Sequence, residues 1–212
     1  MEKTDALGIT GGEYTAFEQA YEWFNQQLFE NALPPCLITL QRKARSRGYF
    51  ANDRFEHRSG GSTTDEIALN PDTFRGRSDK EILSTLVHEM VHCWQRHFGK
   101  VGRGGYHNKE WAVHMVSVGL MPTDTGEAGG KTTGQSVTHY IMDGGAFDRT
   151  ADVLLATGYQ LQWQSYGFDE EEGKRKAASK TKYTCPECEQ NAWARPSANL
   201  VCGDCEVQME EQ

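Results

Sequence analysis

Residues 86–95 read LVHEMVHCWQ and place two histidines four positions apart, with a glutamate directly after the first. Residues i and i+4 of a helix share one face, so His88 and His92 can offer two imidazole nitrogens to one zinc ion. In such a helix Glu89 faces the open coordination position, where it can move a proton from a water to a leaving amine. The stretch is otherwise apolar, and an unpaired buried carboxylate is costly. A metal site therefore explains these three residues better than packing does.

A catalytic zinc needs a third protein ligand, which must come from further along the chain. In the extended metzincin motif a histidine stands six residues after the second one, and Phe98 at that position excludes this class. His97 lies about 140° around the helix from the second histidine, so it points away from the metal and is expected at the surface. Spacing leaves open three candidates that share one helix face: His107, Glu110 and His114.

Four cysteines near the C-terminus form two C-x2-C pairs separated by thirteen residues: Cys185, Cys188, Cys202 and Cys205. Two such pairs predict a closed tetrahedral site for a structural zinc ion, here in a small zinc ribbon. A segment of about 30 residues buries too little apolar surface to fold without that metal. The two other cysteines, Cys36 and Cys93, are expected to be small buried apolar residues.

The charge pattern bears on possible partners. A formal net charge of −8 argues against a protein that covers nucleic acid with its whole surface. Two segments, 41–47 and 173–182, are nevertheless basic, and Trp193 could stack on a base or pack the ribbon onto the main domain. The possible nucleic-acid contacts are Arg42, Lys43, Arg45, Arg47, Lys174, Arg175, Lys176, Trp193 and Arg195. No apolar run is long enough to span a membrane and no signal peptide is evident, so we expect a cytoplasmic protein without a membrane partner.

The elements that must position these residues follow from periodicity and turn residues. Apolar residues at steps of three and four predict a helix from Glu13 to before Pro34, and another from Ser78 or Asp79 to about Phe98. Further helices are expected at about 108–119 and 147–157. Strands are expected at 37–41, 47–52, 66–70, 138–142 and 159–163, the first three in one small antiparallel sheet. The fold class is therefore α+β, with helices packed on a small sheet.

The chain divides as follows in this interpretation: a flexible N-terminus at 1–12, a main domain at 13–121, an extension packed on it at 122–168, a charged linker at 169–182 and the ribbon at 183–207. His139 and Tyr140 fall in the extension. A tyrosine near the metal could stabilise an oxyanion, but packing is the preferred interpretation of both.

Several motifs occur together in this chain: HEMVH, a 14-residue spacer, His107 with a tryptophan four positions later, the HM pair at 114–115, FENALPP at 29–35, the RGYF strand, EIALNP and a C-terminal zinc ribbon. In this combination they resemble the SprT/Spartan family of zinc metalloproteases. The likeness covers about 13–120 and 183–207. It implies a zincin-like domain, with His88, His92 and His107 as zinc ligands and Glu89 as general base. Glu110 and His114 would then support a ligand or pack nearby.

The resemblance also implies a function. It suggests a zinc endopeptidase with one catalytic and one structural zinc ion, which cuts proteins bound or cross-linked to DNA. Single-stranded DNA is the expected nucleic-acid partner, and the protein would associate with the nucleoid when bound to it. The alternative is a zinc-containing nucleic-acid-binding or regulatory module without protease activity. The intact Glu89 counts against that alternative, because a site that no longer catalyses has no need of the carboxylate.

Overall fold

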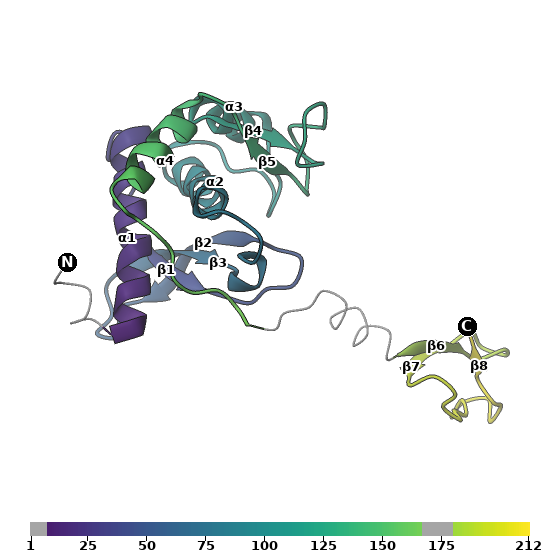
Figure 1. The fold of residues 1–212 in the computed structure, drawn as a ribbon. Coiled ribbons are helices and arrows are strands. Elements are labelled where there is room, and N and C mark those ends of the chain that lie inside the picture. The colour runs from purple at the N-terminus through teal and green to yellow at the C-terminus, as the bar shows by residue number, and fades with distance from the viewer. Residues whose placement is uncertain (1–7, 167–179) are drawn as a thin grey trace. The chain divides into compact units, whose positions relative to one another are not determined.

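The computed structural model describes residues 8–166 and 180–212. The chain forms two compact units, one ending at Ser165 and the other beginning at Tyr166. Figure 1 shows the three-stranded sheet at the bottom of the first unit, with the helices beside and above it. In these described ranges four helices and small sheets are present, which is compatible with the expected α+β class. No helix in the described ranges is both long and apolar enough to cross a membrane.

The first helix, α1 (Gly8–Leu28), buries one face, on which Phe17, Tyr21 and Phe24 recur at steps of three and four. It begins five residues earlier than Glu13, the expected start. The expectation relied on the polar, Gly-rich composition of the first dozen residues, but once a helix exists each added residue gains a hydrogen bond. Residues 8–12 therefore belong to α1 rather than to a flexible terminus, and residues 1–7 lie outside the described residues.

The sheet of the first unit contains β1 (Leu37–Leu40), β2 (Gly48–Glu56) and β3 (Thr63–Leu69) in the order β1-β3-β2. The antiparallel prediction is wrong for one pair: β2 and β3 are antiparallel, whereas β1 runs parallel to β3. The reason is that β3 inserts between the two strands that precede it, so β1 and β2 do not pair. This order leaves β2 at an edge of the sheet, beside α2.

Helix α2 (Asp79–Phe98) crosses the unit between the sheet and the remaining elements (Figure 1). Ser78 caps its N-terminus in a capping box with Glu81, which satisfies two otherwise free backbone N–H groups. Its middle turns are completely buried, including Leu86, Val87 and Met90, so the helix is held on several sides. This rigid setting fixes the positions of the side chains that α2 carries.

On the other side of α2 lie α3 (Lys109–Ser117), the antiparallel pair β4 (Leu120–Thr123) and β5 (Thr138–Ile141), and α4 (Ala146–Ala156). Phe147 of α4 stacks on Phe24 of α1, with ring centroids 5.4 Å apart. These elements belong to the same apolar core as α1 and α2. Residues 122–165 are therefore part of this unit.

The expected strand at 159–163 is not formed. Instead these residues run along the helices and form hydrogen bonds with carboxylate side chains and with one backbone carbonyl of the helices. Tyr159 donates its hydroxyl to Ala16 O at 3.0 Å, and the Gln162 N–H donates to Glu13 at 3.2 Å. Leu161 N–H bonds Asp79 in the same way. The alternating pattern of YQLQW thus reflects one side of the segment facing the helices, and no strand of the described ranges pairs with it.

The second unit is a three-stranded antiparallel sheet of β6 (Thr181–Thr184), β7 (Asn191–Ala194) and β8 (Glu210–Glu211), in the order β7-β6-β8. Within residues 180–212 its buried core consists of four residues: Tyr183, Cys185, Cys202 and Met209. So small a core cannot stabilise a fold without cross-links. The linker expected at 169–182 lies mostly outside the described residues.

Candidate metal centre

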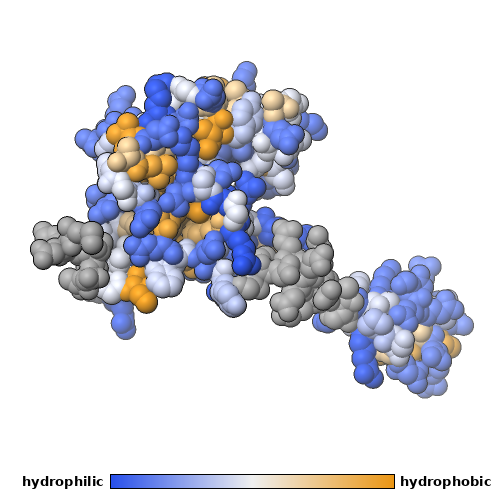
Figure 2. Space-filling view, in the orientation of Figure 1, coloured by the Kyte–Doolittle hydropathy of each residue, from blue (hydrophilic) through white to orange (hydrophobic). Residues whose placement is uncertain are grey.

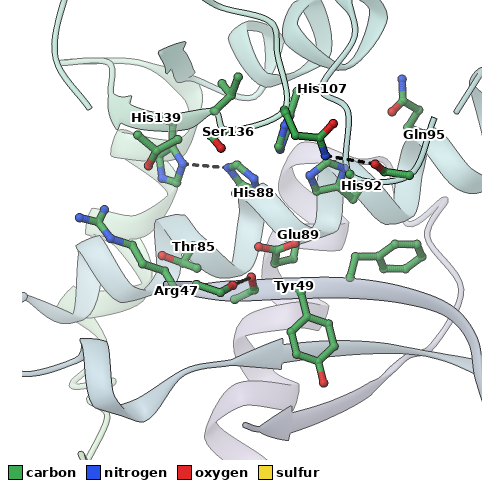
Figure 3. A pocket seen from close by; sticks show the side chains of 18 of the residues that line it. Arg47, Tyr49, Thr85, His88, Glu89, His92, Gln95, His107, Ser136 and His139 are labelled. Carbon is green, nitrogen blue, oxygen red and sulfur yellow. Dashed lines mark hydrogen bonds between the residues drawn. The ribbon is translucent and has the colours of Figure 1, made fainter. Parts of the chain in front are cut away.

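Helix α2 presents His88 and His92 on one face, one turn apart, as their spacing requires. Their ring centroids are 5.2 Å apart. His107, which precedes α3, completes a cluster with them, at 5.5 Å from His88 and 4.8 Å from His92 between ring centroids. One ring nitrogen from each of the three lies within 4.8 Å of the others, which is close enough to hold one metal ion. Figure 3 shows the three rings converging above Glu89.

His107 reaches the cluster because a second loop holds it. Its backbone exchanges two hydrogen bonds with Gly134, at 2.8 and 3.0 Å. Its ring Nδ1 also lies 3.2 Å from Gly134 O, so Nδ1 carries the hydrogen and donates it. Nε2 of His107 is then left with a free lone pair. This is the arrangement of an imidazole prepared to bind a metal, in which the nitrogen away from the metal is fixed by a hydrogen bond.

The buried setting keeps these histidines neutral, as metal ligands must be. Burial, together with the neighbouring histidines His139, His92 and His107, lowers the pKa of His88 well below its usual range. Burial likewise lowers the pKa of His92 to about 3. Desolvation lowers the pKa of His107, although its bond to Gly134 partly opposes this. Three neutral donors on one side of a cleft fit a divalent cation.

Glu89 lies beside the cluster, pointing from α2 toward β2 (Figure 3). It is 5% exposed, and burial raises its pKa to about 8; the charge of Lys43 and a hydrogen bond from the Phe50 N–H act against this. Within the described residues no cation pairs directly with the Glu89 carboxylate. A buried carboxylate without a counter-ion, next to three neutral imidazoles, is a site that gains stability from a bound metal.

Trp111 of α3 closes the inner side of the cluster. Its ring stacks on His92 at 5.1 Å and meets His107 edge-on at 4.3 Å. It is completely buried, so its indole excludes water from behind the histidines. In the sequence this tryptophan, four positions after His107, contributed only to the family resemblance. The structure shows that it packs behind the three histidines.

The two other candidates for the third ligand lie elsewhere. Glu110 accepts hydrogen bonds from Lys100 N at 2.6 Å and from Gln95 Nε2 at 3.2 Å, and so holds the glycine-rich connection. His114 stacks on Trp94, with ring centroids 3.7 Å apart. Among the described residues, neither belongs to a group that could share a metal with His88.

His139 is the residue that the sequence interpretation missed. It was expected to pack, yet its Nδ1 lies 3.0 Å from Nδ1 of His88, and its Nε2 lies 2.9 Å from Ser84 Oγ. Burial, together with the nearby Arg77 and Arg47, lowers its pKa to about 3. No spacing rule connects two residues 51 positions apart, so the sequence offered no signal for this contact. Tyr140, next to it, is half-buried and does not line the cleft.

The cluster of His88, His92 and His107 opens into a cleft with a volume of about 740 Å³. One wall is formed by the start of β2 and the residues before it, and another by the segment 135–139. Three arginines line it: Arg45, Arg47 and Arg96. Figure 2 shows that the face in view is mostly hydrophilic, with apolar patches that are small and separate.

The remaining basic residues named as nucleic-acid contacts are scattered. Arg42 pairs with Asp72 at 3.3 Å, and the Lys43 ammonium lies over the Tyr49 ring at 4.4 Å from its centroid. In the second unit, Trp193 on β7 is 63% exposed, and Arg195 follows it. Lys174, Arg175 and Lys176 lie outside the described residues. The structure thus places two of these residues, Arg45 and Arg47, at the cleft.

The four C-terminal cysteines come together as their spacing predicted: their sulfurs lie within 4.8 Å of one another. Each C-x2-C pair sits in a turn closed by a backbone hydrogen bond to its first cysteine, from Glu189 N to Cys185 O and from Glu206 N to Cys202 O. The residue after each pair has a similar positive φ, 58° at Glu189 and 57° at Glu206, so the two turns have similar backbone conformations. Four converging sulfurs can hold a metal in a closed site.

A third group of possible ligands lies on the sheet side of α2: Cys36, Asp65 and Cys93. Cys93 is completely buried, as expected, while Cys36 is half-buried; their sulfurs are 3.8 Å apart. Asp65 already bonds the Asp53 N–H at 2.8 Å and His97 Nε2 at 2.7 Å. The aspartate is therefore satisfied without an ion, and His97 is partly exposed, away from the histidine cluster.

Comparison with known proteins agrees with this geometry. A 54-residue stretch of the chain is 54% identical to a Salmonella typhimurium protein described as an uncharacterized protein in the mucB 3' region, covering 26% of this chain and 73% of that relative. The family model of the SprT-like family matches residues 17–134, more than half of the chain, and that range includes all three clustered histidines and Glu89. The chain therefore belongs to the SprT-like family.

Proposed function

We propose that this protein is a zinc-dependent endopeptidase. The observation that carries the proposal is the convergence of His88, His92 and His107 beside the buried, unpaired carboxylate of Glu89. Three imidazoles leave one coordination position open in a tetrahedral zinc site, which distinguishes catalytic from structural sites. Membership in the SprT-like family is consistent with a peptidase of this kind.

The proposed chemistry is hydrolysis of an amide. A zinc ion held by His88, His92 and His107 would act as a Lewis acid that polarises the scissile carbonyl. Glu89 takes a proton from the attacking water as the water oxygen bonds the carbonyl carbon, and delivers that proton to the amine nitrogen as the C–N bond breaks. The backbone N–H of Phe50 favours the charged form of Glu89, the form that can accept this proton.

The walls of the cleft suggest how a polypeptide would bind. β2 is an edge strand, and its first residues, together with those just before it, line the cleft. An extended peptide can add to such an edge through main-chain hydrogen bonds. It would then lie across the metal centre with its side chains alternating in direction, which suits a protein substrate better than a small amide.

We further propose that the substrates are proteins bound or cross-linked to DNA, and that single-stranded DNA is the nucleic-acid partner. Arg45, Arg47 and Arg96 along the cleft and the exposed Trp193 of the second unit are suited to phosphates and bases. Because the net charge is −8, this contact would be local and sensitive to salt. The Cys185–Cys205 group would hold a second, structural zinc ion in a ribbon.

The test is cleavage of a DNA-binding protein and of the enzyme itself, with and without single-stranded DNA, at low and at elevated salt. The zinc content of every preparation is measured alongside. Glu89→Gln is the matched variant, because it keeps the side-chain size but removes the base. We expect fragments from the wild-type protein only with DNA, none from Glu89→Gln, and two zinc ions in both.

Other outcomes would redirect the proposal. Equal cleavage with and without DNA would indicate a general peptidase and remove the DNA partner. Retained activity in Glu89→Gln would remove Glu89 from the mechanism. No fragments under any condition, with two zinc ions bound, would favour the binding or regulatory module over the protease.

A further inference from the structure

His139 of β5 approaches His88 from the side opposite His92 and His107 (Figure 3). The two Nδ1 atoms are 3.0 Å apart, and each residue is 8% exposed. Two neutral imidazoles can share a hydrogen bond only if one nitrogen carries the hydrogen and the other accepts it. The direction of this bond therefore decides which nitrogen of His88 is free to bind a metal.

A chain of hydrogen bonds that begins at the helix backbone fixes that direction. Ser84 donates its only hydroxyl hydrogen to Glu81 O at 2.8 Å, so toward His139 it can only accept. His139 must then carry its hydrogen on Nε2 and donate it to Ser84 Oγ, at 2.9 Å. Nδ1 of His139 is left as an acceptor, and His88 must donate from its own Nδ1. Nε2 of His88 thus keeps its lone pair.

The result matches the arrangement at His107, although the acceptor differs. His107 donates from Nδ1 to a backbone carbonyl, that of Gly134, while His88 donates to a side chain. In metal sites the partner of a ligand's second nitrogen fixes the tautomer and the ring orientation and makes the ligand more basic. His139 occupies that place for His88, although it lies beyond the 17–134 range matched by the family model.

We propose that His139 is a positioning residue that holds His88 in the Nε2-binding tautomer and orientation, through the relay His88–His139–Ser84–Glu81. The inference rests on the proposed metal site, because it concerns how one of its ligands is prepared. It predicts an effect on metal binding itself, which can be measured without any assay of catalysis.

The test compares three variants of the full-length protein. His139→Phe keeps a ring of similar size but removes the acceptor. His139→Gln can restore both bonds, because its amide oxygen accepts and its amide nitrogen donates. His114→Phe is the control, since His114 is a half-buried histidine of the same unit that stacks on Trp94 outside the cluster.

The measurement is zinc affinity by competition with a chelator, together with the visible spectrum of the cobalt-loaded protein. We expect His139→Phe to weaken zinc binding at the histidine site about 10- to 100-fold and to alter the cobalt spectrum. We expect His139→Gln to bind far more tightly than His139→Phe, and His114→Phe to match the wild type. The cysteine site should bind zinc unchanged in all variants.

Two results would overturn the inference: a folded His139→Phe that binds zinc like the wild type, or equal losses in His139→Phe and His139→Gln, which would indicate that the residue only fills space. If His139→Phe does not fold, Ser84→Ala serves instead, because it breaks the relay one step earlier. Weakened zinc binding in Ser84→Ala would support the relay, and wild-type affinity would contradict it. If the wild-type histidine site bound no zinc, the proposed function itself would fail, which separates the two conclusions.

Discussion

Gly48 of β2 lies directly against Glu89 of α2. A Cβ atom at position 48 would come within 3.2 Å of Glu89 Oε1, 3.1 Å of Thr85 Cγ2 and 2.8 Å of Ala68 O. Only a residue without a side chain lets the strand approach the helix this closely. That approach also brings the Phe50 N–H within reach of the Glu89 carboxylate. A single glycine thus sets the separation between the cleft wall and the proposed base.

Gly48→Ala should therefore damage both stability and activity. The added methyl must displace backbone as well as the Glu89 carboxylate, and overpacking of this kind costs about 1–3 kcal/mol. The free energy of unfolding is measured by urea titration and cleavage by the assay above. Gly12→Ala in α1 is the control, because nothing lies within 4 Å of a Cβ there, and alanine should stabilise the helix by about 0.5–1 kcal/mol. Unchanged stability and activity in Gly48→Ala would contradict the close approach.

His114 should make the first unit sensitive to acid. Burial lowers its pKa to about 4 from 6.5, so the unfolded state binds its proton first. The stability that the neutral ring provides is fully present above pH 6.5 and is lost as pH falls from 6.5 toward 4. Each pKa unit corresponds to about 1.4 kcal/mol, and partial solvent exposure reduces the total to about 1–2 kcal/mol.

His114→Phe isolates this effect. Nε2 of His114 has no hydrogen-bond partner in the described part of the chain, and phenylalanine keeps the stacking on Trp94, so little else changes. We expect the wild type to lose about 1–2 kcal/mol more than the variant between pH 7.5 and pH 5, measured by urea unfolding. Acid also releases metal, but from both proteins alike. Parallel losses in the two proteins would show that His114 does not titrate in this range.

The positions of the strands in the first sheet could be predicted from the sequence, but the direction of β1 relative to β3 could not. Segments such as EIALN identify themselves by apolar and β-branched residues, but nothing local states that β3 inserts between β1 and β2. For the segment 159–163, in contrast, the prediction of a strand was itself wrong. Its alternation is typical of a strand, yet its partners are Ala16, Glu13 and Asp79 of two helices. Pairing partners are a tertiary property, and the local pattern does not contain them.

Some residues of the candidate site could likewise be predicted from local spacing, whereas others could not. His88, Glu89 and His92 share one helix, so the helical period alone relates them. His107 could not be separated from Glu110 and His114 by spacing, because its place depends on how the connection before α3 returns to α2, and only resemblance favoured it. His139 carries no sequence signal, since β5 meets α2 only in the folded chain.

The second unit should depend on its metal for folding. Cys202→Ser replaces a buried thiol by a poor zinc ligand, and the four-residue core of this unit cannot compensate. We expect the zinc content to fall by one ion and the amide NMR signals of residues 180–212 to lose dispersion, while those of residues 8–165 stay in place. Cys36→Ser is the control and should keep both ions. Dispersed signals from 180–212 in Cys202→Ser would show that this unit folds without the metal.

Glu89 should give the metal-stripped protein a characteristic dependence on pH. Burial raises its pKa to about 8 from 4.5, so the folded state holds this proton more tightly than the unfolded state. The stability linked to the protonated carboxyl is fully present below pH 4.5 and is lost as pH rises through about 8. At about 1.4 kcal/mol per pKa unit, the loss has an upper limit of about 5 kcal/mol.

Glu89→Gln removes the titrating group and should remove this loss. After treatment with a chelator, the wild type should lose stability relative to Glu89→Gln between pH 6 and pH 9, as measured by urea unfolding of both proteins. A bound cation near the carboxylate favours its charged form, so added zinc should largely abolish the difference. The same relative loss with and without zinc would mean that no cation binds near Glu89. Because this comparison requires no substrate, it tests the charge of the site separately from the proposed peptidase reaction.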